Sequence, residues 1–369
     1  MCSSDLELYL IGTDITDAGL KELVGLQNLV ELRIGNTDIT DAGLKELAKL
    51  KNLKTVGIVG TSVTEAGVKE FGEALPEMQH NWGRGGGGGG GGQRADPDFD
   101  VSVKDPAYTE KHPSVLFDEA HQNFHTASGR YKGFADLIAS DGYRVTPNKD
   151  LLTDEGLAGH DLLIIANASV GRGGRPGPDD SETTASAFSE AECESVRKWV
   201  EEGGALLLVT DHEPFGSASA ELGKQFGVEM SLRVASDRAN ESADGLHFLR
   251  ERNHIGDHPI MQGRSERERV NHVLTFTGQS LKGPPGSVAL LKFSDTAIEG
   301  DGNGQQVSAA GRAQGVALKF GRGRVVVMGE AGQLSAQLAG NEPMGMNVPG
   351  CDNRKMALNL MHWLTGLID

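Results

Sequence analysis

The peptide TDITDAGLKEL occurs twice without change, at Thr13–Leu23 and at Thr37–Leu47, and a looser copy, TSVTEAGVKEF, spans Thr61–Phe71. The copies begin at positions 13, 37 and 61, so the period is 24 residues. A fixed period of this size is typical of a solenoid, in which each unit buries its apolar face only against its neighbours. The period therefore predicts a small stacked domain over residues 1–80, separate from the rest of the chain.

Each copy belongs to a unit that reads L-x-x-L-x-L-x-x-T-x-I and continues as DAGLKEL. In the second unit these positions are Leu29, Leu32, Ile34, Thr37 and Ile39. The pattern resembles the bacterial leucine-rich repeat, with Thr where many families carry Asn. It predicts a strand over Glu31–Ile34, followed by a helix that Asp41 caps and whose leucines pack back onto the strand.

A binding surface on the repeats would lie at the outward strand positions. These are Glu7, Tyr9, Glu31, Arg33, Lys54 and Thr55. They are mixed in charge and small, so no partner can be named from them; a protein or a glycan is the partner that a binding function would require. Three repeats are close to the minimum for a stable stack, and Met1–Asp5 are too short to cap it. We therefore expect either a natural protein that extends beyond this N-terminus or another surface that covers this end.

The composition excludes several classes of protein. The chain has 369 residues and a formal net charge of −17, which opposes binding to a nucleic-acid backbone. The arginines in Arg264–Arg269 are interrupted by Glu266 and Glu268, so nucleic acid is not an expected partner. No apolar run reaches the length of a membrane span. The sequence leaves two cellular compartments possible. The chain as given would be cytoplasmic, and it would be extracytoplasmic if a signal peptide precedes it.

The cysteines and the glycines give two further constraints. Cys2, Cys193 and Cys351 are widely spaced and form no CxxC pair, which argues against a disulfide scaffold or a zinc ribbon. Gly85–Gly92 lie inside GRGGGGGGGGQRADPD, and glycine this dense predicts a flexible linker over residues 81–105. A phosphate-binding loop would need a preceding strand and a following GK[ST], and both are missing.

Residues 106–369 alternate between buried strand patterns and helical patterns, which predicts a sheet covered by helices. The expected strands are Val115–Phe117, Leu162–Ala166, Leu206–Thr210 and Val325–Met328. The expected helices are Tyr131–Ser140, Ser189–Glu202, Ala218–Phe226 and Asn353–Leu367. Gly171–Ala187 is a long polar loop, which fits a flap over the sheet edge or a disordered insertion. FGRGR at Phe320–Arg324 and GDGNGQ at Gly300–Gln305 are typical of hairpin turns.

Three stretches carry a resemblance to a known superfamily. They are VLFDEAHQNFHTASGRYKGFADLIASDGY, GGALLLVTDHEPFG and GRVVVMGEAGQLS…NRKMALNLMHWLTG. They resemble the class I glutamine amidotransferase-like superfamily, and within it the DUF4350-type and ThuA-like members. The likeness covers about residues 114–368. It implies an α/β fold with a flavodoxin-like parallel sheet that helices cover on both faces.

The chain departs from the superfamily's enzymes at the position of the nucleophile. In those enzymes a strand leads into a sharp turn that bears a catalytic Cys, and the alignment places Asp211 there. The matching His-x-Glu after the last strand is replaced by Gly329 and Glu330. This departure implies that glutamine hydrolysis by the family route is excluded. Ser217 lacks the G-x-S-x-G context of a serine nucleophile.

Polar residues follow the predicted strands, at the edge where ligands bind in open parallel sheets. We take as candidate catalytic residues Asp118, His121, Asp211, His212 and Glu330. If a metal binds, its expected ligands are Asp118, His121 and Asp211, because converging carboxylates and imidazoles can hold a divalent ion. The alternative is structural, since a carboxylate at a strand end often caps the next helix. In NHIGDHPI, Gly256 and Pro259 favour a structural turn over a metal-binding His pair on a helix.

Two functions follow from these observations. The first is binding or scaffolding, with the repeats holding a partner and a non-catalytic amidotransferase-like domain binding a small ligand or another subunit. The alternative is a hydrolase, acting on a carbohydrate or an amide through the Asp/His/Glu cluster, with or without a metal. The missing nucleophile favours the first, and the gathering of polar side chains favours the second.

Overall fold

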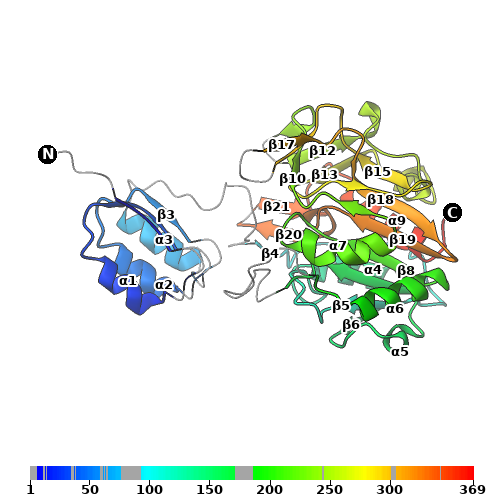
Figure 1. Ribbon diagram of the computed structural model, residues 1–369, viewed down its shortest axis with the longest axis horizontal. Helices are drawn as coiled ribbons and strands as arrows, with labels where there is room; N and C mark the ends of the chain where they lie inside the picture. The colour runs from blue at the N-terminus through cyan, green and yellow to red at the C-terminus, as the bar shows by residue number, and fades with distance from the viewer. Residues whose placement is uncertain are drawn as a thin grey trace. The chain divides into compact units, whose positions relative to one another are not determined.

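The computed structural model describes residues 6–75, 93–170, 186–242, 245–300, 305–340 and 342–369, apart from positions 11, 12, 14, 35, 36, 38, 59, 60, 62 and 64. The chain divides into two compact units, Met1–Gln93 and Arg94–Asp369 (Figure 1). Several expectations fall outside the described residues: Cys2, the glycine run 85–92, the loop over 171–185 and the turn at 301–304. Within the described residues, no helix is long and apolar enough to cross a membrane.

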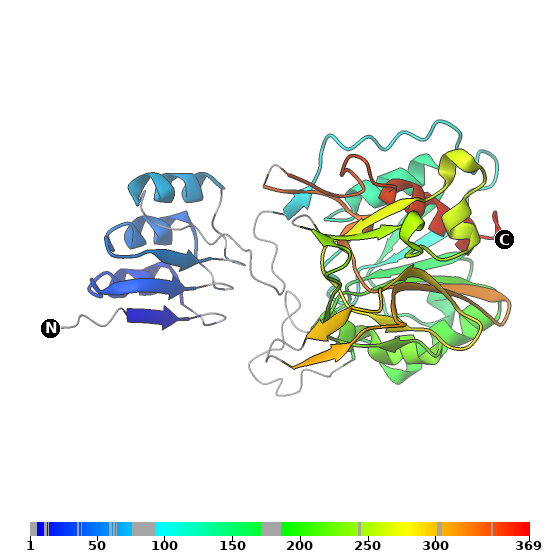
Figure 2. The same ribbon diagram turned by 90° about the horizontal axis from the view of Figure 1, so that it is seen from above.

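The smaller unit repeats a strand followed by a helix three times. Its strands are β1 (Leu6–Tyr9), β2 (Leu29–Arg33) and β3 (Thr55–Gly57), which form a parallel sheet in that order. Its helices are α1 (Asp17–Leu23), α2 (Asp41–Leu47) and α3 (Glu65–Ala74). Figure 2 shows the strand–helix pairs stacked in sequence order. Leu32 and Ile34 are fully buried, as their spacing predicts, because each unit covers its apolar face with the next.

The helix cap differs from the prediction. The N-cap of α2 is Thr40, whose hydroxyl accepts a hydrogen bond from the Ala42 N–H, and Asp41 is the first helical residue. The aspartate of the repeat has another role. One oxygen of Asp17 accepts the Thr40 backbone N–H at 2.8 Å and the other accepts the Thr40 hydroxyl at 2.7 Å. The aspartate of one repeat therefore fixes the helix start of the next repeat.

This contact explains the glycine of the repeat. A Cβ added at Gly43 would lie 2.4 Å from Asp17 Oδ1, and one added at Gly67 would lie 2.1 Å from Asp41 Oδ1. Alanine favours a helix over glycine by about 1 kcal/mol, but overpacking costs about 1–3 kcal/mol. We expect Gly43→Ala to lower the melting temperature of the smaller unit, as measured by circular dichroism.

The matched control is Gly25→Ala, because a Cβ at Gly25 meets nothing within 4 Å. It should leave the melting temperature within the error of measurement. An unchanged melting temperature for Gly43→Ala would contradict the proposed steric role of the glycine.

The larger unit is built on a mixed sheet. Among the described residues its strand order is β6-β5-β7-β8-β19-β18-β14-β9, and β15 also pairs with β18. Its strands are β5 (Ser114–Asp118), β6 (Arg144–Asn148), β7 (Leu162–Ala166), β8 (Ala205–Val209), β9 (Glu229–Met230), β14 (Leu281–Lys282), β15 (Val288–Lys292), β18 (Ala313–Phe320) and β19 (Gly323–Met328).

The expectation of a wholly parallel sheet was wrong for half of it. Strands β6, β5, β7, β8 and β19 are parallel, but β18 runs antiparallel to β19, and β14 and β15 run antiparallel to β18. The reason is the predicted hairpin turn at 320–324. Phe320 pairs with Gly323, and Gly321 between them has φ 58°, so the chain reverses directly.

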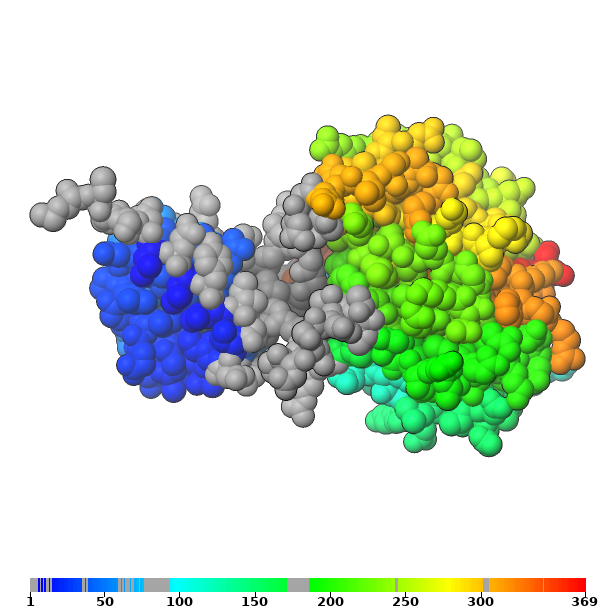
Figure 3. All heavy atoms as spheres, in the orientation of Figure 1, coloured from blue at the N-terminus to red at the C-terminus, as the bar shows by residue number. Residues whose placement is uncertain are grey.

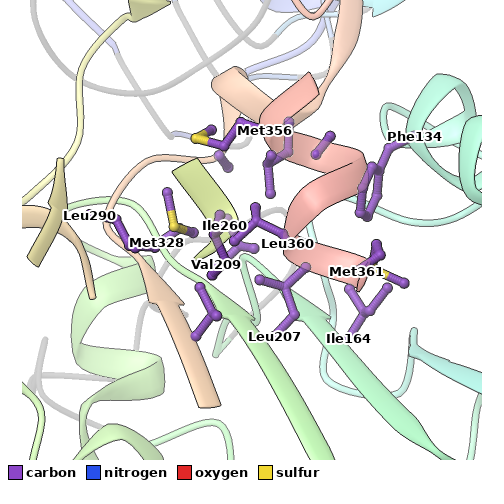
Figure 4. Close-up of a cluster of buried hydrophobic side chains, with 14 of the residues drawn as sticks. Phe134, Ile164, Leu207, Val209, Ile260, Leu290, Met328, Met356, Leu360 and Met361 are labelled. Atoms are coloured by element: carbon purple, nitrogen blue, oxygen red, sulfur yellow. The ribbon is translucent and has the colours of Figure 1, made fainter. Parts of the chain in front are cut away.

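Helices cover both faces of this sheet. They are α4 (Lys132–Ser140), α5 (Asp154–Leu157), α6 (Glu190–Glu201), α7 (Phe215–Gln225), α8 (Pro259–Gln262) and α9 (Asn353–Leu364). Alternate residues of β7 join different cores: Leu162 and Ile164 pack with α4 and α9, whereas Leu163 and Ile165 pack with α6 and α7. Figure 3 shows the green segment with α6 and α7 on one face, and Figure 4 shows the first core.

The described residues also form three smaller sheets, with strand orders β10-β16-β17, β11-β12-β13 and β21-β20-β4. Their strands are β4 (Gln93–Ala95), β10 (Val234–Ser236), β11 (Glu241–Ser242), β12 (Gly245–Leu249), β13 (His272–Thr275), β16 (Ile298–Gly300), β17 (Gln306–Ser308), β20 (Ala336–Ala339) and β21 (Glu342–Gly345).

The end of the predicted linker is held against the larger unit. The Asp96 N–H donates to the Ala336 carbonyl, and Arg354 donates to the carbonyls of Asp100 and Ser102. The larger unit accordingly begins at Arg94. Residues 94–105 are thus part of this unit, because their backbone and the ring of Phe99 contact it.

Candidate functional site

The parallel strands bring polar residues to one edge of the main sheet, at their carboxyl ends. Asp118 ends β5, Asn167 follows β7, Asp211 lies two residues after β8 and Glu330 lies two residues after β19. Because these strands are parallel neighbours, their ends lie at the same edge. The residues nevertheless form two separate groups of contacts.

The first group is Asp118, His121 and Glu192. The imidazole of His121 lies between the two carboxylates: Nδ1 is 2.9 and 3.0 Å from the oxygens of Asp118, and Nε2 is 2.9 Å from Glu192 Oε1. All three residues are buried, with exposed fractions of 0%, 6% and 6%. Since a carboxylate accepts hydrogen bonds, both ring nitrogens must carry protons to donate, and the imidazole is then a cation.

The electrostatics of this group agree with its geometry. Burial acts against the charged imidazole, but Asp118 and Glu192 outweigh it and raise the pKa of His121. Burial also acts against the Glu192 carboxylate. Hydrogen bonds from Ser189, from the Leu152 N–H and from His121 still lower the pKa of Glu192. This group is a closed ion cluster that ties the loop after β5 to the start of α6.

The second group centres on Asp211. Its Oδ2 accepts a hydrogen bond from Asn167 Nδ2 at 2.8 Å, and its backbone N–H donates to Asn167 Oδ1 at 2.9 Å. Asn167 is fully buried and has φ 47°, a left-handed conformation that asparagine tolerates. The other oxygen, Oδ1, is buried without a hydrogen-bond partner in the described structure. Burial raises the pKa of Asp211, although Asn167, His212 and the Ala331 amide act in the opposite direction.

Glu330 is the second carboxyl of this group. Its oxygens accept the backbone N–H groups of Gly332 and Gln333 at 2.6 and 2.8 Å. Burial and then the charge of Asp211 raise the pKa of Glu330 well above its ordinary value, against the effect of the two amides. Both carboxyls are buried and repel each other when ionised, so the pair favours holding a proton over carrying two negative charges.

An aromatic wall adjoins this pair. Tyr131 is fully buried and donates its hydroxyl to the Ala331 carbonyl at 2.7 Å. Burial, Glu330 and Asp211 raise the pKa of Tyr131. The ring of His125 lies 4.7 Å from that of Tyr131, and burial followed by Arg130 lowers the pKa of His125 to about 3. We call Asp211, Glu330, Tyr131 and His125 the Asp211 group.

The predicted set of catalytic and metal-binding residues is therefore divided. Asp118 and His121 are engaged with Glu192, whereas Asp211 and Glu330 belong to the other group. In the part of the chain that the structure describes, no group of three or more His, Cys, Asp or Glu residues is arranged to hold a metal ion. His212 is buried, and its Nδ1 donates to the Glu213 carbonyl at 2.8 Å.

The possible nucleophiles lie in ordinary structural positions. Cys193 is buried within α6, and burial raises its pKa to about 11. Cys351 lies in the loop before α9, where its thiol is 3.1 Å from the Val348 carbonyl and burial raises its pKa. Ser217 lies within α7 and donates its hydroxyl to the Glu213 carboxylate. A raised thiol pKa disfavours the thiolate that a nucleophile requires.

Sequence reasoning missed Glu192 and Tyr131 as members of these groups, and it placed His125 at the sheet edge without choosing it as a candidate site residue. For Glu192 a local signal exists, because Ser189 and Glu192 have the S-x-x-E spacing of a capping box, which the structure contains. That spacing predicts the start of α6 but not the bond to His121, which lies 71 residues away in sequence. Tyr131 begins an expected helix, and only the fold places it beside the carboxyl pair.

Comparison with known proteins gives weak likenesses. No protein-family model matches the chain, and no curated protein does. The N-terminal domain of mmIFT52 superimposes with a TM-score of 0.49 at 17% identity, over 68% of this chain and 97% of that one. A putative ThuA-like protein from Bacteroides uniformis superimposes with a TM-score of 0.35 at 11% sequence identity, over 70% of this chain and 94% of that one. A putative GMP synthase subunit from Thermoplasma acidophilum superimposes with a TM-score of 0.35 at 12% sequence identity, over 69% of this chain and 94% of that one. At these values the likenesses carry no argument about activity.

Proposed function

We propose that this chain is a binding or scaffolding protein with two recognition modules. The smaller unit is a leucine-rich-repeat stack whose outward strand positions hold a protein or glycan. The larger unit is an amidotransferase-like, ThuA-like domain without a cysteine nucleophile, which binds a small polar ligand at the carboxyl edge of its sheet. The parallel repeats β1–β3 and the position of Asp211 after β8 support this division.

The observation that carries the proposal is the free oxygen of Asp211. A buried carboxylate oxygen without a hydrogen-bond donor is costly, and a ligand hydroxyl or amide N–H would supply the missing donor. Asp211 as a whole is partly exposed, unlike the fully buried Asp118, although its Oδ1 is itself buried. Ligands with hydroxyl or amide donors are sugars and amides, the same substrate classes that the alternative function requires.

The alternative function is a hydrolase, and the carboxyl pair is the specific observation in its favour. The raised pKa values of Glu330 and Asp211 favour a proton held by the pair, and two carboxyls of which one is protonated are the arrangement that general acid–base catalysis uses. In a hydrolase Asp211 would accept a proton from water or substrate, and Glu330 would donate one to the leaving group. Asp118 and His121 would then keep the loop after β5 in place.

One substitution tests the binding proposal. The Asp211→Asn substitution keeps one side-chain oxygen, which can still accept the hydrogen bond from Asn167 Nδ2. It replaces the other oxygen, Oδ1, with an NH2 group, which is a donor. We expect the affinity for a bound sugar or amide to fall by about tenfold, since a hydrogen bond to a charged group contributes about 1.5–3 kcal/mol. The measurement is calorimetric titration of wild type and variant with galactose, N-acetylglucosamine and L-glutamine.

The matched control is Asp136→Asn, on the exposed side of α4, which should bind as the wild type does. Equal affinity of Asp211→Asn and wild type would contradict the role of the free oxygen, and no binding of any probe to the wild type would contradict the ligand class. Release of ammonia from glutamine, or of nitrophenol from a nitrophenyl galactoside, would favour the hydrolase if Asp211→Asn abolishes it.

A further inference from the structure

A cavity lies at the end of the main sheet opposite to Glu330. It has a volume of about 660 Å³, and its walls come from the end of α7, the start of α8, the turn before β15, the end of β18 and α9. Ala317–Phe320 of β18 line it beside the first residue of β19, whereas Glu330 follows the last residue of β19. The two sites are therefore separated by the length of these strands, and this cavity needs a function of its own.

His258 presents a hydrogen-bond donor in this cavity. Its Nδ1 accepts the Ile260 backbone N–H at 3.2 Å, so Nδ1 carries no proton. Burial, followed by the charges of Arg324 and Lys319, lowers the pKa of His258 to about 4. The imidazole is therefore neutral at pH 7, and its single proton must lie on Nε2. His258 is only 8% exposed and lines the cavity, and the hydrogen bond that its ring makes to the described residues is through Nδ1, which leaves Nε2 for a ligand.

The other walls are apolar and aromatic. The ring of Trp363 lies 4.8 Å from that of His258 at an angle of 68°, and Phe226 and Phe320 contact each other edge to face with 5.1 Å between ring centres. All four side chains line the cavity, together with Pro284 and its neighbours in the turn before β15. Flat rings pack well against such walls, because aromatic pairs prefer offset or edge-to-face contacts.

The charges near the cavity are already compensated. Lys319 pairs with Asp369 at 2.6 Å, and Arg324 donates to the carbonyls of Trp363 and Ile368 and lies 3.4 Å from Asp369. A ligand carboxylate would have to displace one of these contacts. A neutral oxygen acceptor needs only the unpaired N–H of His258.

From the unpaired donor and the aromatic walls together, we propose that this cavity binds an uncharged, flat aromatic molecule that carries a carbonyl oxygen. The rings lie against Phe320 and Trp363, and the carbonyl accepts the Nε2–H of His258. This assigns the larger unit a second small-molecule site, independent of the Asp211 group and of the function proposed for it.

The test compares two probes of similar size, coumarin, which has the carbonyl, and naphthalene, which lacks it. We expect the wild type to bind coumarin more tightly than naphthalene. The His258→Asn substitution should lower the affinity for coumarin about fivefold and leave the affinity for naphthalene unchanged. Asparagine can still accept the Ile260 N–H but does not reach the cavity as Nε2 does. Val288→Trp, which fills the cavity, should weaken both probes. Affinities are measured by ligand-observed NMR titration.

The control is His112→Asn, at an exposed histidine away from the cavity, which should bind as wild type does. If the variants do not fold, the Nε2–H resonance of His258 in the wild type decides the matter, and we expect coumarin but not naphthalene to shift it. Three results would overturn the proposal. They are no saturable binding of coumarin, an equal loss of affinity for both probes in a folded His258→Asn protein, and a His258 Nε2–H resonance that coumarin does not shift.

Discussion

Replacing His121 by leucine is expected to lower the free energy of unfolding by about 3–5 kcal/mol, the usual cost of breaking a buried ion pair. The substitution removes the cation between Asp118 and Glu192, whose side chains are 0% and 7% exposed. Both carboxylates would then stay buried without a neighbouring cation, and a leucine side chain cannot donate a hydrogen bond to either of them. Urea denaturation at pH 7, followed by circular dichroism, measures the loss.

The pH dependence of stability gives an independent readout of the same cluster. Because the pKa of His121 is raised above 6.5 in the folded protein, its contribution is complete below 6.5 and is lost as the pH rises through the folded value. The Glu192 pKa is lowered from 4.5, so its contribution is present above 4.5 and is lost as the pH falls through the folded value. The His121→Leu variant should lose less stability than wild type between pH 6.5 and 9.

The matched control for both measurements is His112→Leu. His112 is exposed and makes a hydrogen bond to the Gly142 carbonyl, outside any ion cluster. We expect it to change the unfolding free energy by less than about 1 kcal/mol. A loss of similar size in the two variants, or an unaltered pH profile for His121→Leu, would contradict the description of His121 as a buried cation.

Truncation of Leu360 to alanine should cost about 2–5 kcal/mol. Leu360 lies on the inner side of α9, fully buried, and belongs to the core that includes Leu207, Ile164 and Met328 of the sheet (Figure 4). Removing its branched end leaves a cavity between helix and sheet that neighbouring side chains fill only in part. The measurement is the same urea titration, extrapolated to water.

Leu367→Ala is the control for this core. Leu367 is 40% exposed, beyond the end of α9, so its truncation should change stability by no more than about 0.5 kcal/mol. A cost below about 1 kcal/mol for Leu360→Ala would mean that α9 does not hold its face of the sheet.

Much of the local structure was predictable because its signals lie within a few residues. The strand over 162–166 begins and ends where its apolar run does, and the helix expected from 353 begins there. FGRGR also predicts the hairpin at 320–324, and the direct reversal of the chain there forces β18 to run antiparallel to β19. The helix cap in the repeats was misassigned by one residue, because the Asp17 side chain acts on the following repeat.

The sequence by itself determined the 24-residue repeat, the alternation of strands and helices and the polar residues at the strand ends, since each depends on periodicity or on adjacency in the chain. The tertiary structure alone decided which of those polar residues meet. It paired His121 with Glu192 and Asp211 with Glu330, because hydrogen bonds and charge repulsion act over a few ångströms in space, whatever the separation in sequence.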